Sequence, residues 1–145
     1  MVETVAIDLS ELTNKFNVIQ ERIKSFIGTR SFPSVKAQMI RYMNDLSILE
    51  CDVVSLWSEI SITKVYVDAD YKKNVKQAYN NASQFDEIPK WRADITVYCE
   101  SSVVDAKKIV EILESNCTAL DKYNWLFKSH RESANHYYQF LSGEI

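Results

Sequence analysis

Residues 34–83 read SVKAQMIRYMNDLSILECDVVSLWSEISITKVYVDADYKKNVKQAYNNAS, and neither Gly nor Pro interrupts these fifty residues. Apolar side chains recur in the stretch at alternating steps of three and four. This seven-residue repeat is typical of a helix that packs along its whole length against other helices. At about 1.5 Å per residue, such a helix would be roughly 70 Å long. The repeat consists of Met39, Tyr42, Leu46, Leu49, Val53, Leu56 and Ile60, and it resumes after Thr63 at Val67, Tyr71, Val75, Ala78 and Ala82.

Part of this stretch also has the composition of a strand. Residues 60–67 are rich in β-branched side chains and alternate polar with apolar positions, which by itself favours β-structure. No turn residue flanks the segment on either side, however, and the seven-residue repeat continues through it. We therefore predict one continuous helix, with Ser34 as its N-cap.

A shorter helix is predicted before it. Asp8, followed three residues later by Glu11, is expected to cap its start, and Gly28 is expected to end it. Residues 1–7 are then either a tail or a segment that packs on a neighbour. The apolar face of this helix consists of Leu9, Leu12, Phe16, Ile19, Ile23 and Phe26.

A second long helix is predicted after Pro89, starting between residues 94 and 102 and ending at Gly143. Its repeat is interrupted by Asn124 and Arg131. A polar residue in such a seam can fix helix register at a cost in stability, or the helix can turn these two positions toward solvent. Both interpretations stay open. The other positions of the repeat are Val103, Ala106, Val110, Leu113, Cys117, Leu120, Phe127, Ala134, Tyr138 and Leu141.

Composition agrees with these long elements. The 145 residues are 46% apolar, which suffices for a buried core, and they include only two Gly and two Pro. Turn-rich β-folds need many more turn residues. We predict a single all-α domain, 1–145, in which a short N-terminal helix and two long helices form an extended antiparallel hairpin or bundle. No apolar stretch spans a membrane, no signal peptide is recognised, and the three cysteines lie far apart, which predicts reduced thiols in the cytoplasm.

Aromatic side chains gather near the end of the chain on more than one helical face. A hairpin of this kind has a high surface-to-volume ratio and is not expected to bury all of them by itself. We therefore predict a homo-oligomer whose interface includes Trp125, Phe127, Tyr137, Tyr138 and Phe140.

Catalytic chemistry has little support in the sequence. The two histidines, His130 and His136, do not share a helical face, and the pair Glu132 and His136 is typical of a solvated surface contact. Phosphate-binding, dinucleotide-binding and nucleophile-elbow motifs are not found. We predict a protein that is not an enzyme and that has no metal and no cofactor.

Basic residues gather between positions 64 and 92, where six cations face four acidic residues although the whole chain carries −3. Aromatic residues are interleaved with them. Cations that neutralise phosphates, with aromatic rings on which bases stack, are the ingredients of single-stranded DNA binding. The alternative is an ordinary solvated helix face and a loop, with Trp91 closing the end of the hairpin. The candidate binding residues are Lys64, Lys72, Lys73, Lys76, Lys90, Trp91 and Arg92.

Several segments of the last third agree in order and spacing with a known family. They are ADITVY at 93–98, VEILE at 110–114, ALD at 119–121 and YQFLSG at 138–143. These segments resemble the C-terminal part of UvsY-type recombination mediators of T-even-like phages. The resemblance implies a small helical protein of the host cell cytoplasm that forms rings, binds single-stranded DNA and helps load a recombinase. Residues 46–62 depart from the family's basic middle region, because they contain no Lys or Arg.

Two functional hypotheses follow. The first is a recombination mediator that binds single-stranded DNA and a recombinase as a helical oligomer. The second is a helical adaptor or inhibitor that binds another protein and no nucleic acid. The acidic overall charge favours the second hypothesis, whereas the basic and aromatic stretch and the resemblance favour the first.

Overall fold

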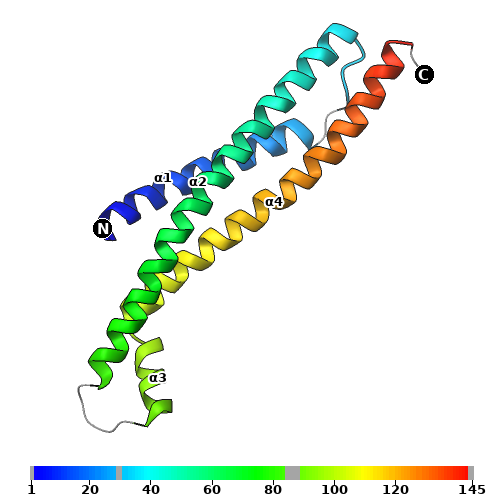
Figure 1. The fold of residues 1–145 in the computed structure, drawn as a ribbon. Coiled ribbons are helices and arrows are strands. Elements are labelled where there is room, and N and C mark those ends of the chain that lie inside the picture. Colours follow the sequence, from blue (N-terminus) through cyan, green and yellow to red (C-terminus); the bar gives the residue numbers. More distant parts are fainter. Residues whose placement is uncertain (1, 29–30, 84–88, 144–145) are drawn as a thin grey trace. The chain divides into compact units, whose positions relative to one another are not determined.

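The computed structural model describes residues 2–28, 31–83 and 89–143, and the side chains of residues 9–28, 31–82 and 89–143. It contains four helices in these ranges: α1 (Val2–Ile27), α2 (Lys36–Ser83), α3 (Lys90–Tyr98) and α4 (Ser101–Leu141), as Figure 1 shows. No strand occurs among the residues that it describes. The all-helical prediction is therefore confirmed, and residues 60–67 lie inside α2 as predicted.

Two of the predicted helix starts differ from the structure, that of α1 by several residues and that of α2 by one residue. Helix α1 begins at Val2 rather than after Asp8. Once a helix is nucleated, each added residue contributes a hydrogen bond, so a cap-like side chain does not by itself stop it. The Val35 carbonyl accepts the first hydrogen bond of α2, 2.9 Å from the Met39 amide, so Ser34 is not its N-cap. The helix end predicted at Gly28 is confirmed, because α1 stops at Ile27.

Helix α3 was not predicted, because residues 90–92 were expected in a loop. Pro89 precedes the helix with φ −52° and ψ 145°, and its carbonyl accepts the amides of Arg92 and Ala93 at 3.0 and 3.1 Å. Proline is favoured at helix starts because its fixed φ suits the first turn and its missing N–H has no helical partner to lose. The second long helix starts at Ser101, inside the predicted interval.

The chain divides into two compact units, and α2 and α4 each contribute a segment to both. Unit 1 comprises Met1–Glu59 and Cys117–Ile145, and unit 2 comprises Ile60–Asn116. The prediction of one domain stays a prediction. Each unit is described separately below.

In unit 1, α1, the first half of α2 and the second half of α4 form a three-helix core. Helix α1 runs antiparallel to α2, because Lys15 pairs with Glu59 at 3.0 Å and Phe26 stacks on Tyr42 with ring centroids 4.6 Å apart. The buried side chains are the predicted repeat positions: Leu12, Phe16, Ile19, Ile23, Met39, Tyr42, Leu46, Leu49, Val53, Leu56, Leu120, Phe127 and Ala134.

The two polar positions of the α4 repeat both belong to this unit. Asn124 is half-buried, whereas Arg131 lies at the solvent edge and forms an ion pair with Glu50 of α2. The interpretation that the helix turns these positions outward therefore applies to Arg131.

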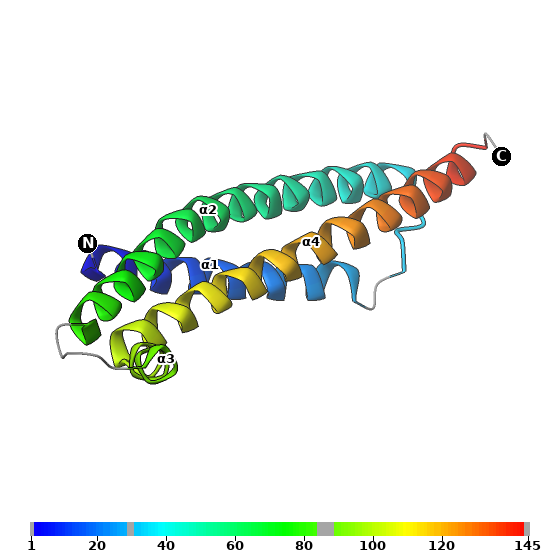
Figure 2. The same ribbon diagram turned by 60° about the horizontal axis from the view of Figure 1, so that its bottom comes forward.

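In unit 2, the second half of α2 packs antiparallel to the first half of α4, and α3 lies beside the end of α2 and the start of α4 (Figure 2). The core of unit 2 is built from smaller side chains than that of unit 1. Helix α3 contributes only Val97 to it. One cluster joins Ala78 and Ala82 of α2 to Val97 and Val103. The other buried residues are Ile60, Val67, Ala106, Val110 and Leu113.

Candidate nucleic-acid interface

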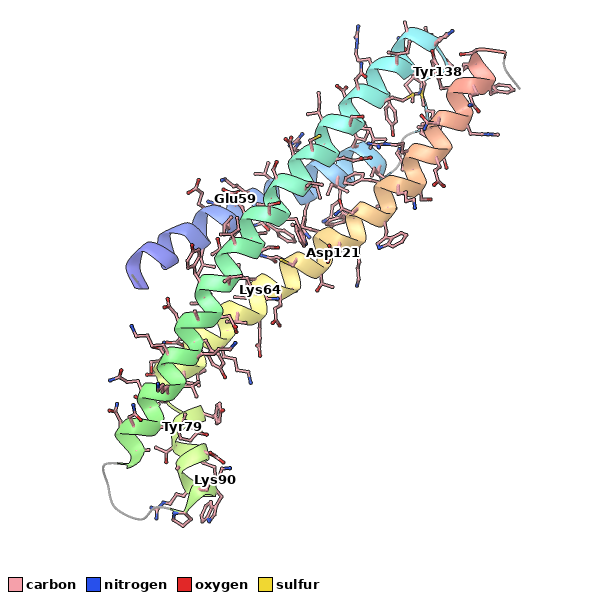
Figure 3. The ribbon with its side chains drawn as sticks, in the orientation of Figure 1. Glu59, Lys64, Tyr79, Lys90, Asp121 and Tyr138 are labelled. Carbon is pink, nitrogen blue, oxygen red and sulfur yellow. The ribbon has the colours of Figure 1, made fainter. Side chains whose placement is uncertain are left out.

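All seven residues predicted to bind nucleic acid lie in unit 2, on two elements. Helix α2 carries four lysines, and the first turn of α3 carries the other three residues. Figure 3 labels Lys64 and Tyr79 on α2 and Lys90 on α3. The residues on α2 are Lys64, Lys72, Lys73 and Lys76, and those on α3 are Lys90, Trp91 and Arg92.

Three of the α2 lysines face solvent together. Lys72, Lys73 and Lys76 are exposed, because the buried repeat of α2 occupies the opposite face of the helix. Lys72 forms an i,i+4 ion pair with Asp68 at 3.0 Å, and both side chains are well exposed. Lys64 differs from them: it is half-buried and lies 3.7 Å from Glu114 of α4. The structure therefore groups three of the four predicted lysines and separates Lys64 from them.

The first turn of α3 presents an aromatic ring between two cations. Trp91 is 65% exposed, so it does not close the end of a hairpin as one interpretation proposed. Lys90 and Arg92 are also exposed. The Pro89 position, where the helix starts, has no side-chain cap hydrogen bond from a described residue. A helix N-terminus and two cations both favour an anion at this position.

Helix α3 is held against α2 by Tyr79, one of the aromatic residues interleaved with the basic ones in the sequence. The Tyr79 hydroxyl donates to the Asp94 carboxylate at 2.5 Å, and the Tyr79 ring meets Tyr98 edge-on at 6.3 Å. The hydrogen bond to Asp94 raises the pKa of Tyr79 well above its ordinary value. The bond joins α3 to the last turns of α2, on the side of α2 that carries Ala78 and Ala82. No sequence signal pairs Tyr79 with Asp94, because the bond depends on tertiary packing.

The aromatic residues predicted as an oligomer interface differ in how far they are buried in unit 1. Phe127 is only 1% exposed and belongs to the core, so it is not available to a second copy. The assignment of Phe127 to an oligomer interface was therefore wrong, because its ring stands in the apolar repeat of α4 and is enclosed. The expectation that the chain does not bury all five rings agrees with the structure. Tyr137 and Tyr138 are half-buried against the cluster of Met39, Tyr42 and Ala134. Only Trp125 and Phe140 are largely exposed.

His130 of unit 1 is partly buried and contacts Tyr42. Tyr42 and His130 share a hydrogen bond between the hydroxyl and Nε2, and burial lowers the pKa of His130 from its ordinary value of 6.5. The neutral imidazole can then accept a hydrogen bond from the Tyr42 hydroxyl. Within the described ranges, no three His, Cys, Asp or Glu side chains gather closely enough to hold a metal ion.

Comparison with protein-family models, with curated proteins and with solved structures finds no match to this chain. The resemblance to UvsY-type mediators therefore stays a prediction. Among the described helices, none combines the length and the apolar character that crossing a membrane requires.

Proposed function

We propose that this chain is a non-enzymatic recombination mediator, which binds single-stranded DNA through unit 2, associates with copies of itself and contacts a recombinase. The observation that carries the DNA-binding part is the exposed Trp91 between Lys90 and Arg92. This trio lies on the same unit as the solvent-facing Lys72, Lys73 and Lys76. The proposal that the partner is a recombinase rests on the resemblance of the last third of the chain to UvsY-type mediators.

The two groups of residues can act on different parts of a DNA strand. Lys72, Lys73 and Lys76 fall within about one helical turn, roughly 6 Å along the axis, which lets them meet neighbouring phosphates. Trp91 offers a ring face to an unpaired base, and such stacking contributes about 1–3 kcal/mol per base. Lys64 is left out of the proposed site, because it is half-buried and lies toward Glu114 of α4, whereas the other three lysines are exposed.

A titration with an unlabelled oligonucleotide at several salt concentrations tests this site. Each phosphate contact on a single strand changes the slope of log K against log salt by about 0.7. The triple variant Lys72→Ala, Lys73→Ala, Lys76→Ala should therefore weaken binding and make the slope shallower by about 2. Trp91→Ala should weaken binding about 5- to 150-fold and leave the slope nearly unchanged, since stacking releases no counterions.

A matched control is available on the same unit. Lys107 and Lys108 are exposed lysines of α4 outside the proposed site. Lys107→Ala, Lys108→Ala removes nearly the same charge and should leave affinity and salt slope close to wild type. An equal loss in this control would mean that only overall charge matters and that no defined site exists.

The second candidate is an adaptor or inhibitor that binds only protein. It is favoured by the exposed apolar side chains of unit 2, among them Ile62, Val65 and Tyr66. If the wild-type protein binds no oligonucleotide at about 50 mM salt, where phosphate contacts are strong, the mediator proposal fails and the adaptor becomes the better account.

A further inference from the structure

Helix α2 carries a second apolar face in unit 2, opposite the face that packs on α4. Ile62, Val65 and Tyr66 are 60–68% exposed, and the exposed Ala69 continues the spacing i, i+3, i+4, i+7. Lys73 and Lys76 extend the same face by two further turns. We call these six residues the outer stripe. Single exposed apolar residues are ordinary, but three neighbouring ones on one face mark an interaction surface.

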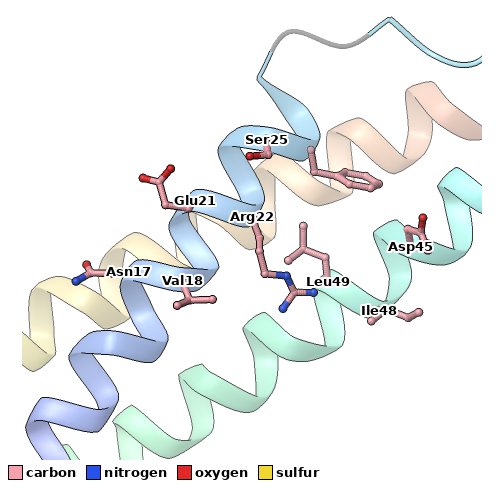
Figure 4. Close-up of a pocket in the computed structure, with 9 residues that line it drawn as sticks. Asn17, Val18, Glu21, Arg22, Ser25, Asp45, Ile48 and Leu49 are labelled. Carbon is pink, nitrogen blue, oxygen red and sulfur yellow. The ribbon is translucent and has the colours of Figure 1, made fainter.

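A hollow that is lined by carboxylates lies in unit 1 between α1 and α2. Figure 4 shows it, with Val18 and Arg22 on α1 and Asp45 and Ile48 on α2. It has a volume of about 710 Å³, and a second hollow of about 450 Å³ shares Val18 and Arg22 with it. We call the two together the α1–α2 groove. Val18 and Ile48 leave 56–58% of their surface exposed there.

The charge of the groove is negative. Its two cations, Lys15 and Arg22, are already paired with Glu59 at 3.0 Å and with Asp52 at 2.8 Å. Asp45 forms no ion pair with another described residue. The carboxylates that line the groove are Glu11, Glu21, Asp45, Asp52 and Glu59.

The two surfaces match in length as well as in charge. The outer stripe extends over about 21 Å of helix, and the groove follows α1 from Glu11 to Phe26, about 22 Å. Two stripes aligned in parallel would set Lys73 and Lys76 against their own copies, and two grooves would set carboxylates against carboxylates. A stripe in a groove instead brings apolar residues together and cations to carboxylates.

We propose that the outer stripe of one copy binds the α1–α2 groove of a second copy. The contact is heterologous, because each copy contributes a different surface and keeps the other surface open for a further copy. The inference concerns the self-association part of the proposed function, and it needs neither DNA nor a recombinase. It also places the interface away from the C-terminal aromatic residues, most of which pack inside unit 1.

Two surface variants and their mixture test this contact by light scattering at micromolar concentration. The stripe variant Tyr66→Asp, Lys73→Glu and the groove variant Val18→Lys, Asp45→Lys change exposed positions only, so both should keep wild-type helicity in circular dichroism. Wild type should assemble beyond two copies, whereas each variant alone should have the 16.8 kDa of one chain. The equimolar mixture retains one intact stripe and one intact groove, so it should form a dimer and nothing larger.

Other results would overturn the inference. A wild-type mass of one chain excludes self-association, and a groove variant that still assembles points to stripe-on-stripe pairing. A mixture that stays monomeric shows that the two surfaces do not meet. The control Val54→Asp, Lys108→Glu changes an exposed apolar residue and a cation outside both surfaces, and it should assemble like wild type. If the control also fails to assemble, the contact is not specific to the stripe.

One consequence rests on the proposed DNA site. Lys73 and Lys76 belong both to the outer stripe and to the proposed DNA site. An oligonucleotide should therefore compete with assembly and reduce the mass measured by light scattering. If the mass does not fall although the oligonucleotide binds, the DNA site must lie elsewhere, and the mixing experiment still decides the assembly contact.

Discussion

Units 1 and 2 use the same two long helices but differ in the helix that accompanies them. In unit 1, the described side chains of α1 include four buried ones, Leu12, Phe16, Ile19 and Ile23. In unit 2, the nine-residue α3 supplies Val97 alone. The turns of α2 around Ile62, Val65 and Tyr66 consequently keep an exposed apolar face. The length of the third helix thus decides which unit has a well-filled core and which unit leaves an apolar face of α2 exposed.

The difference in side-chain size points the same way. The largest fully buried side chains of unit 1 are Phe127, Met39 and Leu46, whereas the cluster beside α3 consists of alanines and valines. Because stabilisation scales with the apolar area buried, we expect most of the stability in unit 1. Three measurements would break or sharpen this comparison.

The largest effect is expected for Phe127→Ala in unit 1. The ring is 1% exposed, and removing it leaves a cavity in the core. The free energy of unfolding should fall by about 3–5 kcal/mol, which urea unfolding followed by circular dichroism can measure. Trp125→Ala, two residues earlier on α4 and 71% exposed, is the control and should change stability by no more than about 0.5 kcal/mol. Similar losses in both variants would contradict the assignment of Phe127 to the core.

A smaller effect is expected for Val97→Ala in unit 2. The substitution removes two methyl-sized groups from a buried site, which costs about 2 kcal/mol including the cavity. The loss should be local, so that hydrogen exchange speeds up in α3 while the amides around Phe127 keep their protection. Ile95→Ala, on the exposed face of the same helix, should leave exchange unchanged. Equal acceleration throughout both units would mean that they unfold as one.

The smallest effect concerns pH. Burial lowers the pKa of His130 below 6.5, so the unfolded chain takes up a proton more readily than the folded one. The contribution of His130 to stability is therefore complete above about pH 6.5. It declines as the pH falls from there toward the lowered pKa of the folded state. His130→Gln should flatten this part of a plot of stability against pH, whereas His136→Gln, at an exposed position, should not. A wild-type curve that rises toward low pH in this window would contradict the burial of His130.

The helices were largely readable from the sequence, for a reason specific to this chain. The repeats from Met39 to Ala82 and from Val103 to Leu141 predicted the buried face of both long helices, because a helix that packs along its length must repeat its apolar residues. Phe127 is a position of the second repeat, so the repeat already predicted that this residue is buried in the core. Pro89 was a start signal for α3 that was interpreted only as a break.

The candidate site was readable only in part. The sequence identified Lys72, Lys73, Lys76 and the Lys90–Arg92 trio, since charge and aromatic character are properties of the residues themselves. It could not separate Lys64 from this group, because the ion pair with Glu114 joins two residues fifty positions apart. The contact between Tyr79 and Asp94 was missed because it too depends on tertiary packing.

The sequence by itself determined that the chain is helical, which face of each long helix is buried, and where its cations gather. These are local properties, set by side-chain type and by a period of about 3.6 residues per turn. Only the tertiary structure decided that a short third helix leaves Ile62, Val65 and Tyr66 exposed, that Phe127 is enclosed, and that α1 and α2 form an acidic groove. Each of these depends on which helices become neighbours, and burial is a property of the neighbours and not of the residue alone.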